Sequence, residues 1–212
     1  MRVSTSNNGF SLVELLCATA VIATLTVVAV NASGVAMEQS RSVECLSNLR
    51  QIGTAMQLYV GDFNGRLPSS GLDRDPDGTS RSWVNTLSDY LGPDFIGRCP
   101  DQKNHPAKVS YGWNDLLTED PSGVGIPVVA VRQPSATIAV VELAGGQTSE
   151  HLHFRGAIRN SRLTGNQFRS FANTVCHGLG SNYLFADGRA EKITWTEVQR
   201  RLAPQNSNFI NP

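Results

Sequence analysis

The run from Phe10 to Val30 is apolar except for serine, threonine and one glutamate, and it contains no proline, glycine, lysine or arginine. A helix needs about 20 residues to cross the hydrocarbon core of a bilayer, and this run is long enough. A short polar leader with one basic residue, Arg2, precedes it. The run therefore predicts a membrane-spanning helix close to the N-terminus.

Three interpretations fit such a run: a plain anchor, a secretory signal removed after the small-residue site Val30-Asn31-Ala32, and a segment cleaved after Gly9. Glu14 discriminates among them, because a carboxylate in hydrocarbon costs roughly 2.5–3.5 kcal/mol. An anchor or a disposable signal gains nothing from that carboxylate. Cleavage after Gly9 would instead create an amine on Phe10 in the same apolar layer, and pairing amine with carboxylate offsets part of the cost.

The sequence Gly9-Phe10-Ser11-Leu12-Val13-Glu14-Leu15-Leu16 resembles the cleavage and methylation motif of type IV prepilins. The resemblance implies that a prepilin peptidase removes residues 1–9 and methylates the new N-terminal Phe10. It also implies that Phe10 and Glu14 are assembly residues. A pair formed between the amine of one subunit and the carboxylate of its neighbour would set the axial register of a filament.

The helix is predicted to continue well beyond the membrane, since no proline occurs between Phe10 and Leu67. Apolar residues recur at spacings of four, three, four and three, which is the pattern of one buried helix face; they are Cys45, Leu49, Ile52, Met56 and Tyr59. A helix from Phe10 to about Asp62 would be ~80 Å long. Its second half is expected to supply a packing face for a sheet.

The remainder of the chain favours short strands after one short helix. The predicted elements are a helix at 83–90, β-branched runs at 126–131 and 137–142, and a final hairpin of 182–186 and 189–195. Asp187-Gly188 between the hairpin strands predicts a two-residue type I′ turn. The expected fold class is α+β and pilin-like, with a long N-terminal helix packed on a small antiparallel sheet. The expected organisation is a leader at 1–9, a transmembrane and assembly helix at 10–30, a helical spine at 31–62 and an extracytoplasmic domain at 63–212.

A second resemblance extends along the chain. Cys45-Leu-Ser-Asn-Leu-Arg-Gln-Ile-Gly53, then Tyr59 and Asp62-x-Asn64-Gly65-x-x-Pro68, look like pseudopilins of the type II secretion G-like group. Nine residues separate His177 from Asp187-Gly188, a spacing that resembles the H-x9-DG tail of one large branch of prepilin-like proteins. That tail implies no known reaction. Cys99-Pro100, Ser110-Tyr111-Gly112-x-Asn114 and Pro134-Ser135 look like the same branch.

These resemblances imply a pseudopilin or minor pilin of a type IV pilus or a type II secretion-like filament. The implied partners are a prepilin peptidase/methyltransferase, other pilin or pseudopilin subunits, and an inner-membrane assembly platform. The implied location is the bacterial inner membrane, with a single pass and the C-terminal domain outside the cytoplasm. The alternative is a membrane-tethered binding module that does not assemble, and only assembly should require Glu14.

Two candidate metal sites have weaker support. Asp73, Asp75 and Asp77 with Gly78 match the first half of a calcium loop, but Val84 stands where the bidentate glutamate belongs. A solvated acidic loop is therefore favoured, and no cofactor is expected. His177 with Asp187 could form a metal pair, with histidines 105, 151 and 153 as further candidates. Because spacing does not assemble three or four ligands, His177 is expected to hydrogen-bond at the hairpin base instead.

The cysteines suggest a structural role rather than catalysis. Cys45 and Cys99 are the favoured disulfide pair outside the cytoplasm, with Cys176 as a rival partner, while Cys17 lies in the apolar run. Cys176 and His177 are not expected to form a dyad, because neighbours in a strand point to opposite faces. No G-x-S-x-G, P-loop or dinucleotide motif occurs, so an enzyme is not expected. Lys+Arg and Asp+Glu both total 18, so no basic field predicts nucleic-acid binding.

Overall fold

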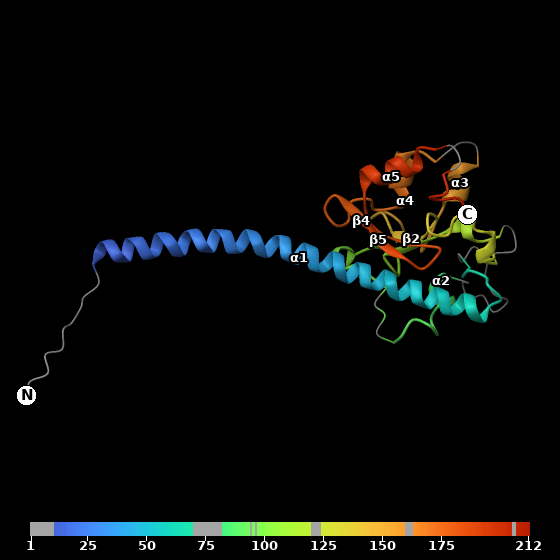
Figure 1. Ribbon diagram of the computed structural model, residues 1–212, viewed down its shortest axis with the longest axis horizontal. Helices are drawn as coiled ribbons and strands as arrows, with labels where there is room; N and C mark the ends of the chain where they lie inside the picture. Colours follow the sequence, from blue (N-terminus) through green and yellow to red (C-terminus); the bar gives the residue numbers. More distant parts are fainter. Residues whose placement is uncertain are drawn as a thin grey trace, which may run out of the picture. The chain divides into compact units, whose positions relative to one another are not determined.

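The computed structural model describes residues 11–69, 82–93, 95, 97–119, 124–159, 163–204 and 207–212. Gly9, Phe10 and the acidic residues Asp73, Asp75 and Asp77 lie outside these residues. The chain divides into two compact units, Met1–Gln39 and Ser40–Pro212. Helix α1, Leu12–Asp62, contributes to both units and ends at the predicted residue (Figure 1).

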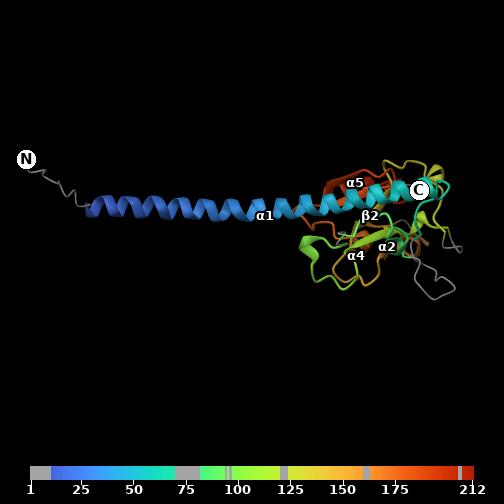
Figure 2. The same ribbon diagram turned by 90° about the horizontal axis from the view of Figure 1, so that it is seen from below.

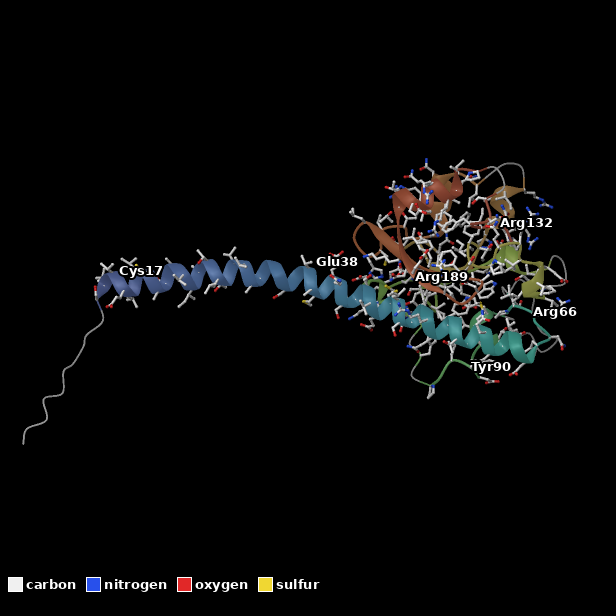
Figure 3. The ribbon with its side chains drawn as sticks, in the orientation of Figure 1. Cys17, Glu38, Arg66, Tyr90, Arg132 and Arg189 are labelled. Carbon is white, nitrogen blue, oxygen red and sulfur yellow. The ribbon has the colours of Figure 1, made fainter. Side chains whose placement is uncertain are left out.

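The first unit consists, among the described residues, of the N-terminal part of α1, and its side chains are exposed all round. The large apolar side chains from Leu12 to Val30 are each 56–76% exposed. Figure 3 shows side chains projecting from every side of this helix, with Cys17 and Glu38 labelled. Its hydroxyl groups are satisfied internally, since Thr24 and Thr26 donate to the carbonyls of Val21 and Ile22. The helix therefore presents an apolar surface with few free polar groups.

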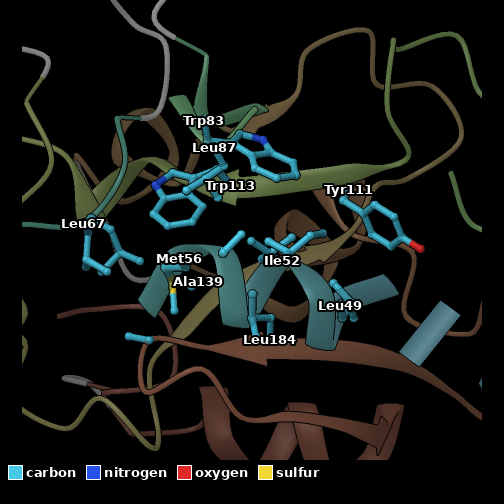
Figure 4. Close-up of a cluster of buried hydrophobic side chains, with 14 of the residues drawn as sticks. Leu49, Ile52, Met56, Leu67, Trp83, Leu87, Tyr111, Trp113, Ala139 and Leu184 are labelled. Atoms are coloured by element: carbon cyan, nitrogen blue, oxygen red, sulfur yellow. The ribbon is translucent and has the colours of Figure 1, made fainter. Parts of the chain in front are cut away.

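Within the second unit, the predicted apolar stripe of α1 is confirmed. Cys45, Leu49, Ile52 and Met56 are fully buried, and Tyr59 is half-buried. Figure 4 shows Leu49, Ile52 and Met56 of this stripe between the side chain of Leu184 and a group that includes Trp83 and Trp113. The apolar surface of the stripe is the main stabilising contact between the helix and the rest of the unit.

A turn with left-handed backbone ends α1. Asn64 and Gly65 have φ of 53° and 74°, and the Gly65 N–H donates to the Val60 carbonyl over 2.9 Å. Such a bond satisfies one of the carbonyl groups left free at a helix C-terminus. The turn formers that the sequence places here therefore act as a helix stop.

Five strands form one sheet among the described residues, in the order β3-β1-β2-β4-β5. The strands are β1 Tyr111–Asn114, β2 Ile138–Glu142, β3 His151–Leu152, β4 Gly180–Phe185 and β5 Ala190–Thr194. The α+β class is confirmed, and the layout is pilin-like, with a long apolar N-terminal helix followed by a small sheet. The sheet is mixed rather than wholly antiparallel, because β3 runs parallel to β1.

The sheet separates two apolar cores. On one face, Val140 and Leu184 pack with the stripe of α1. On the other face, Tyr183 packs with Phe168 and Val198 from two C-terminal helices. Figures 1 and 2 show α1 running along the sheet in the second unit. The remaining helices are α2 Trp83–Thr86, α3 Phe154–Ile158, α4 Gly165–Phe171 and α5 Trp195–Leu202, with 3₁₀ turns η1 Pro100–Gln102, η2 Asp115–Leu117 and η3 Val128–Ala130.

A bulge in β2 decides which side chains face α1. The pairing with β4 shifts between Ile138 and Val140, so Ile138 joins the far core while Ala139 and Val140 both join the core beside α1. Beyond the bulge the strand alternates normally, and Val141 faces the far core. Glu142, two positions after Val140, is thereby directed to the side of α1.

Three sequence predictions are corrected. The turn after β4 is not a two-residue type I′ turn, since only Gly188 of the pair has positive φ, at 87°. The Gly188 N–H donates to the Phe185 carbonyl and the Phe185 N–H to the Arg189 carbonyl, which is a three-residue loop with a glycine bulge. The run at 126–131 forms the short turn η3 rather than a strand, and α2 ends at Thr86 rather than Tyr90.

Candidate functional site

Four buried polar side chains converge between α1 and the sheet. They are Cys45, Cys99, Glu142 and His177, and each residue is 0% exposed. Their Sγ, carboxylate and imidazole nitrogen atoms all lie within 4.8 Å of one another. We call these four residues the buried cluster.

Each member is positioned by local structure. Cys45 is the first residue of the apolar stripe on α1, and Glu142 ends β2 on the face that the bulge selects. Cys99 precedes Pro100 of η1, and its N–H donates to Ser110 Oγ over 2.5 Å. His177 lies in a tight turn before β4, where its N–H donates to the Gly180 carbonyl and Gly178 has φ of 71°.

Glu142 Oε1 is the central acceptor of the buried cluster. It lies 2.7 Å from His177 Nε2 and accepts from the Cys45 thiol over 2.6 Å. Cys99 Sγ lies 3.4 Å from the same His177 nitrogen. The four side chains thus form one connected set of contacts, in which Glu142 joins Cys45 to His177 and His177 joins Cys99.

An outer layer of polar groups orients these side chains. The backbone N–H of Asn182 donates to Glu142 Oε2 over 2.9 Å, and Tyr111 Oη lies 3.1 Å from Cys45 Sγ. His177 Nδ1 lies 2.8 Å from Asp101 Oδ2, as an ion-pair contact outside hydrogen-bond geometry. Asp101 is in turn paired with the Arg41 guanidinium. Each ring or carboxylate is therefore held from outside while its inner atom faces the other members.

Burial and pairing shift the titration of the cluster. Burial raises the pKa of Glu142. Burial opposes the charged form of His177, but its hydrogen bonds with Cys99 and Glu142 raise its pKa to about 10. The contact with His177 works against burial and lowers the pKa of Glu142, while the same contact raises the pKa of His177, so the pair favours a carboxylate beside a protonated imidazole.

The two cluster thiols differ in acidity. Burial raises the pKa of Cys45. Hydrogen bonds from Cys176 and Cys45 lower the pKa of Cys99, because they stabilise its thiolate. Cys99 is therefore the more acidic of the two thiols.

The predicted disulfide pair is brought together but is not bonded. Cys45 and Cys99 are both free thiols in the cluster, and a disulfide between them stays a prediction. Cys176 Sγ lies 3.8 Å from Cys99 Sγ, which places the rival cysteine beside the cluster. Cys176 and His177 both reach Cys99, contrary to the argument from strand alternation, because they lie in a turn rather than in a strand.

His177 hydrogen-bonds at the hairpin base through its backbone N–H, which donates to the Gly180 carbonyl, whereas its side chain enters the buried cluster. Asp187 does not join it there; its carboxylate accepts from the Arg189 N–H at the far end of β4. The other histidines also lie elsewhere. His105 Nε2 lies 2.9 Å from the Ala144 carbonyl, and the rings of His151 and His153 contact each other with centroids 4.6 Å apart.

Sequence reasoning missed Glu142 and Asp101. A signal for Glu142 was present, since a carboxylate ending the apolar run 137–142 is unusual in a buried strand and indicates a partner. Asp101 gave no such signal, because it follows Cys99-Pro100 in a loop. Its contact with His177 depends on the folded chain alone.

At the start of α1, Glu14 has a local role. Its Oε2 accepts from the Ser11 N–H over 2.9 Å, and Ser11 Oγ accepts from the Val13 N–H over 3.3 Å. These contacts cap N–H groups that have no partner inside the helix. The expected pair between the Phe10 amine and Glu14 stays a prediction, since Phe10 is outside the described residues.

Comparison with known proteins gives one match. No curated protein and no solved structure matches the chain. Within the described residues, α1 is the one helix long and apolar enough to span a membrane. Residues 35–96, which include Cys45 and the apolar stripe of α1, are similar to the family described as "Protein of unknown function (DUF1559)".

Proposed function

We propose that this chain is a processed pilin-like subunit, a pseudopilin or minor pilin, that enters a filament through the N-terminal part of α1. One observation carries the proposal: this part of α1 is apolar and exposed on every side, yet has an acid in its first turn. Such a helix needs lipid or other apolar helices around it. Its role is structural, and the domain is carried outside the cytoplasm rather than acting as an enzyme.

Assembly would use the same apolar surface twice. In the membrane the surface contacts lipid, and in the filament it contacts the corresponding helices of other subunits. Cleavage after Gly9 by a prepilin peptidase would free the Phe10 amine, and an assembly platform would bring that amine to Glu14 of a neighbouring subunit. Since an unpaired charge buried among apolar helices costs several kcal/mol, the pair would favour one axial register over others.

The competing proposal is a tethered binding module in which Glu14 serves its own helix. The hydrogen bond from the Ser11 N–H to Glu14 supports that alternative, because it gives the side chain a purely local role. The two proposals differ in whether the charge of Glu14 or only its acceptor atom is required. Glutamine keeps an acceptor for Ser11 and removes the charge, whereas valine removes both.

The test compares wild type, Glu14→Gln and Glu14→Val in the native host. We expect both variants to insert and to be cleaved, since the scissile bond lies upstream, but to be strongly depleted from sheared filaments or from intersubunit cysteine crosslinks. If Glu14→Gln, which keeps the acceptor for the Ser11 N–H, were incorporated much better than Glu14→Val, the local role of Glu14 would be favoured. Equal incorporation of all three proteins would overturn assembly through Glu14.

Cleavage of the N-terminus is the control, because a variant that is not cleaved would be absent from filaments for a reason unrelated to assembly. Mass spectrometry of the membrane-extracted wild type should find N-methylated Phe10 as the first residue, and the two variants should match it. A mature chain that begins at Ser33 would show removal of a secretory signal, and the proposed function would fail at its first step.

A further inference from the structure

We propose that the buried cluster is a structural zinc site in which Cys45, Cys99, Glu142 and His177 are the four ligands. The ligand atoms already lie within 4.8 Å of one another, and all four residues are fully buried. Structural zinc in proteins is held by four such N, S and O donors with no open position. This inference concerns the domain alone and does not depend on filament assembly.

The dimensions fit a tetrahedral ion after a small adjustment. Bonds of about 2.0–2.3 Å place the ligand atoms of tetrahedral zinc roughly 3.3–3.8 Å apart. Cys99 Sγ and His177 Nε2 are 3.4 Å apart, while Cys45 Sγ and Glu142 Oε1 are 2.6 Å apart. Zinc would therefore leave the first pair in place and separate the second by about 1 Å, replacing a thiol hydrogen bond by two bonds to the metal.

The outer contacts are those that a metal-binding histidine and carboxylate require. Asp101 Oδ2 lies 2.8 Å from His177 Nδ1, and a small reorientation would bring the two into hydrogen-bond geometry while Nε2 stays directed into the cluster. The Asn182 N–H occupies Glu142 Oε2 and leaves Oε1 facing inward. A carboxylate on the outer nitrogen of a ligating histidine fixes its tautomer and strengthens it as a donor. Asp101 is thus assigned as a positioning residue.

The donor set selects the class of metal. Two thiolates and an imidazole favour zinc over calcium or magnesium, which take oxygen ligands, and the carboxylate makes the set less suited to copper(I). On binding, the thiols and the imidazole of His177 release their protons to solvent, and the divalent ion then balances most of the negative charge of the two thiolates and the carboxylate. An open surface depression of about 440 Å³ is lined in part by Asp101, which contacts His177 of the cluster.

The four ligands come from segments that are distant in sequence. Cys45 belongs to α1, Cys99 to the loop before η1, Glu142 to β2 and His177 to the turn before β4. A metal that binds the folded arrangement and not the unfolded chain stabilises the fold by mass action. The site would therefore fasten the helix, a loop and two strand ends at one point.

The experiment uses the full-length protein purified in detergent without chelator, with its metal content measured by mass spectrometry. We expect about one zinc per chain in the wild type, as a structural site of this kind holds one ion. Cys45→Ser and Cys99→Ser should lose it, whereas Cys176→Ser should retain it, because Cys176 is adjacent to Cys99 but outside the ligand set. Cobalt added to chelated, reduced protein should give thiolate-to-metal absorption in the wild type and in Cys176→Ser.

A milder variant guards against simple misfolding of the cysteine variants. Asp101→Asn leaves all four ligands intact and should weaken zinc roughly 10–100-fold in chelator competition, with an unchanged circular dichroism spectrum. Equal affinity in Asp101→Asn would overturn the assignment of Asp101 as a positioning residue. Metal-free wild-type protein, with Cys45 and Cys99 either as free thiols or in a disulfide found by non-reducing peptide mapping, would overturn the site as a whole.

Discussion

At the scale of single residues, Asp115 is a carboxyl group that folding removes from water without a full counter-charge. It is 3% exposed, and both its oxygens accept from the Arg155 N–H at 3.1–3.2 Å. The Arg155 guanidinium donates instead to the backbone carbonyls of Asp115 and Thr118. Burial outweighs these contacts and raises the pKa of Asp115 to about 6.

The sign of the resulting pH dependence follows from the direction of this shift. Because the folded state binds the proton more tightly, the contribution to stability is complete below the unfolded pKa near 4 and is lost as pH rises through about 6. Asp115→Asn should therefore be at least as stable as wild type at pH 7, and relative to wild type it should gain about 1–3 kcal/mol between pH 4 and pH 7. Urea unfolding of both proteins in detergent at the two pH values measures this difference in stability. If Asp115→Asn became less stable relative to wild type as pH rises, the ionised carboxylate would be stabilising and the prediction would be wrong.

At the scale of elements, α1 and the β4–β5 turn approach each other closely at two glycines. A Cβ on Gly53 would lie 2.6 Å from the Gly188 carbonyl oxygen and 2.9 Å from Leu184 Cδ1. The Gly188 carbonyl is a backbone group and cannot move aside as the end of a flexible side chain could. Gly53 is therefore required by the docking of the hairpin on the helix, whereas Gly61 on the same helix has no atom within 4 Å of its Cβ position.

The same substitution at these two glycines should have opposite effects. Gly53→Ala should destabilise by about 1–3 kcal/mol through overpacking. Gly61→Ala should stabilise by about 0.4–1 kcal/mol, because alanine reduces the entropy of the unfolded chain and favours helix. Chemical denaturation of both variants gives the two values side by side. Equal small gains at both positions would mean that the hairpin does not rest on α1 at Gly53.

Local patterns predicted the elements that depend on local physics. The stripe from Cys45 to Met56 and the stop after Asp62 follow from helix periodicity and turn formers, and both are confirmed. The partners of Cys45 did not follow, since Glu142 is 97 residues away and faces the helix only because β2 has a bulge. The parallel pairing of β3 with β1 likewise depends on the folded chain. The site was therefore predicted as a pair of cysteines and a separate histidine, and only the structure unites them.

At the scale of the whole molecule, the division between Gln39 and Ser40 predicts an independently folding fragment. Residues 40–212 contain both apolar cores and every member of the buried cluster. A fragment that begins at Ser40 should unfold cooperatively and keep the circular dichroism of a mixed α+β domain. A fragment that begins at Gln57 lacks Cys45, Leu49, Ile52 and Met56 and should not fold, because one side of the sheet is then uncovered. Loss of cooperativity in the longer fragment would contradict a separate domain.

The segment from His177 to Gly188 contacts α1 at both of its ends, and these two contacts fix its length. His177 reaches the neighbourhood of Cys45, and Gly188 rests on Gly53, so the two ends of β4 meet the helix eight positions apart, a distance of about 12 Å. One extra residue between His177 and Gly188 would also shift the register of β4 by one position, which turns every side chain beyond the insertion to the opposite face of the sheet. The number of residues between His177 and Gly188 is therefore matched to the spacing of Cys45 and Gly53 on α1. A chain that lengthens its tail must move the glycine or the cysteine along the helix to fit.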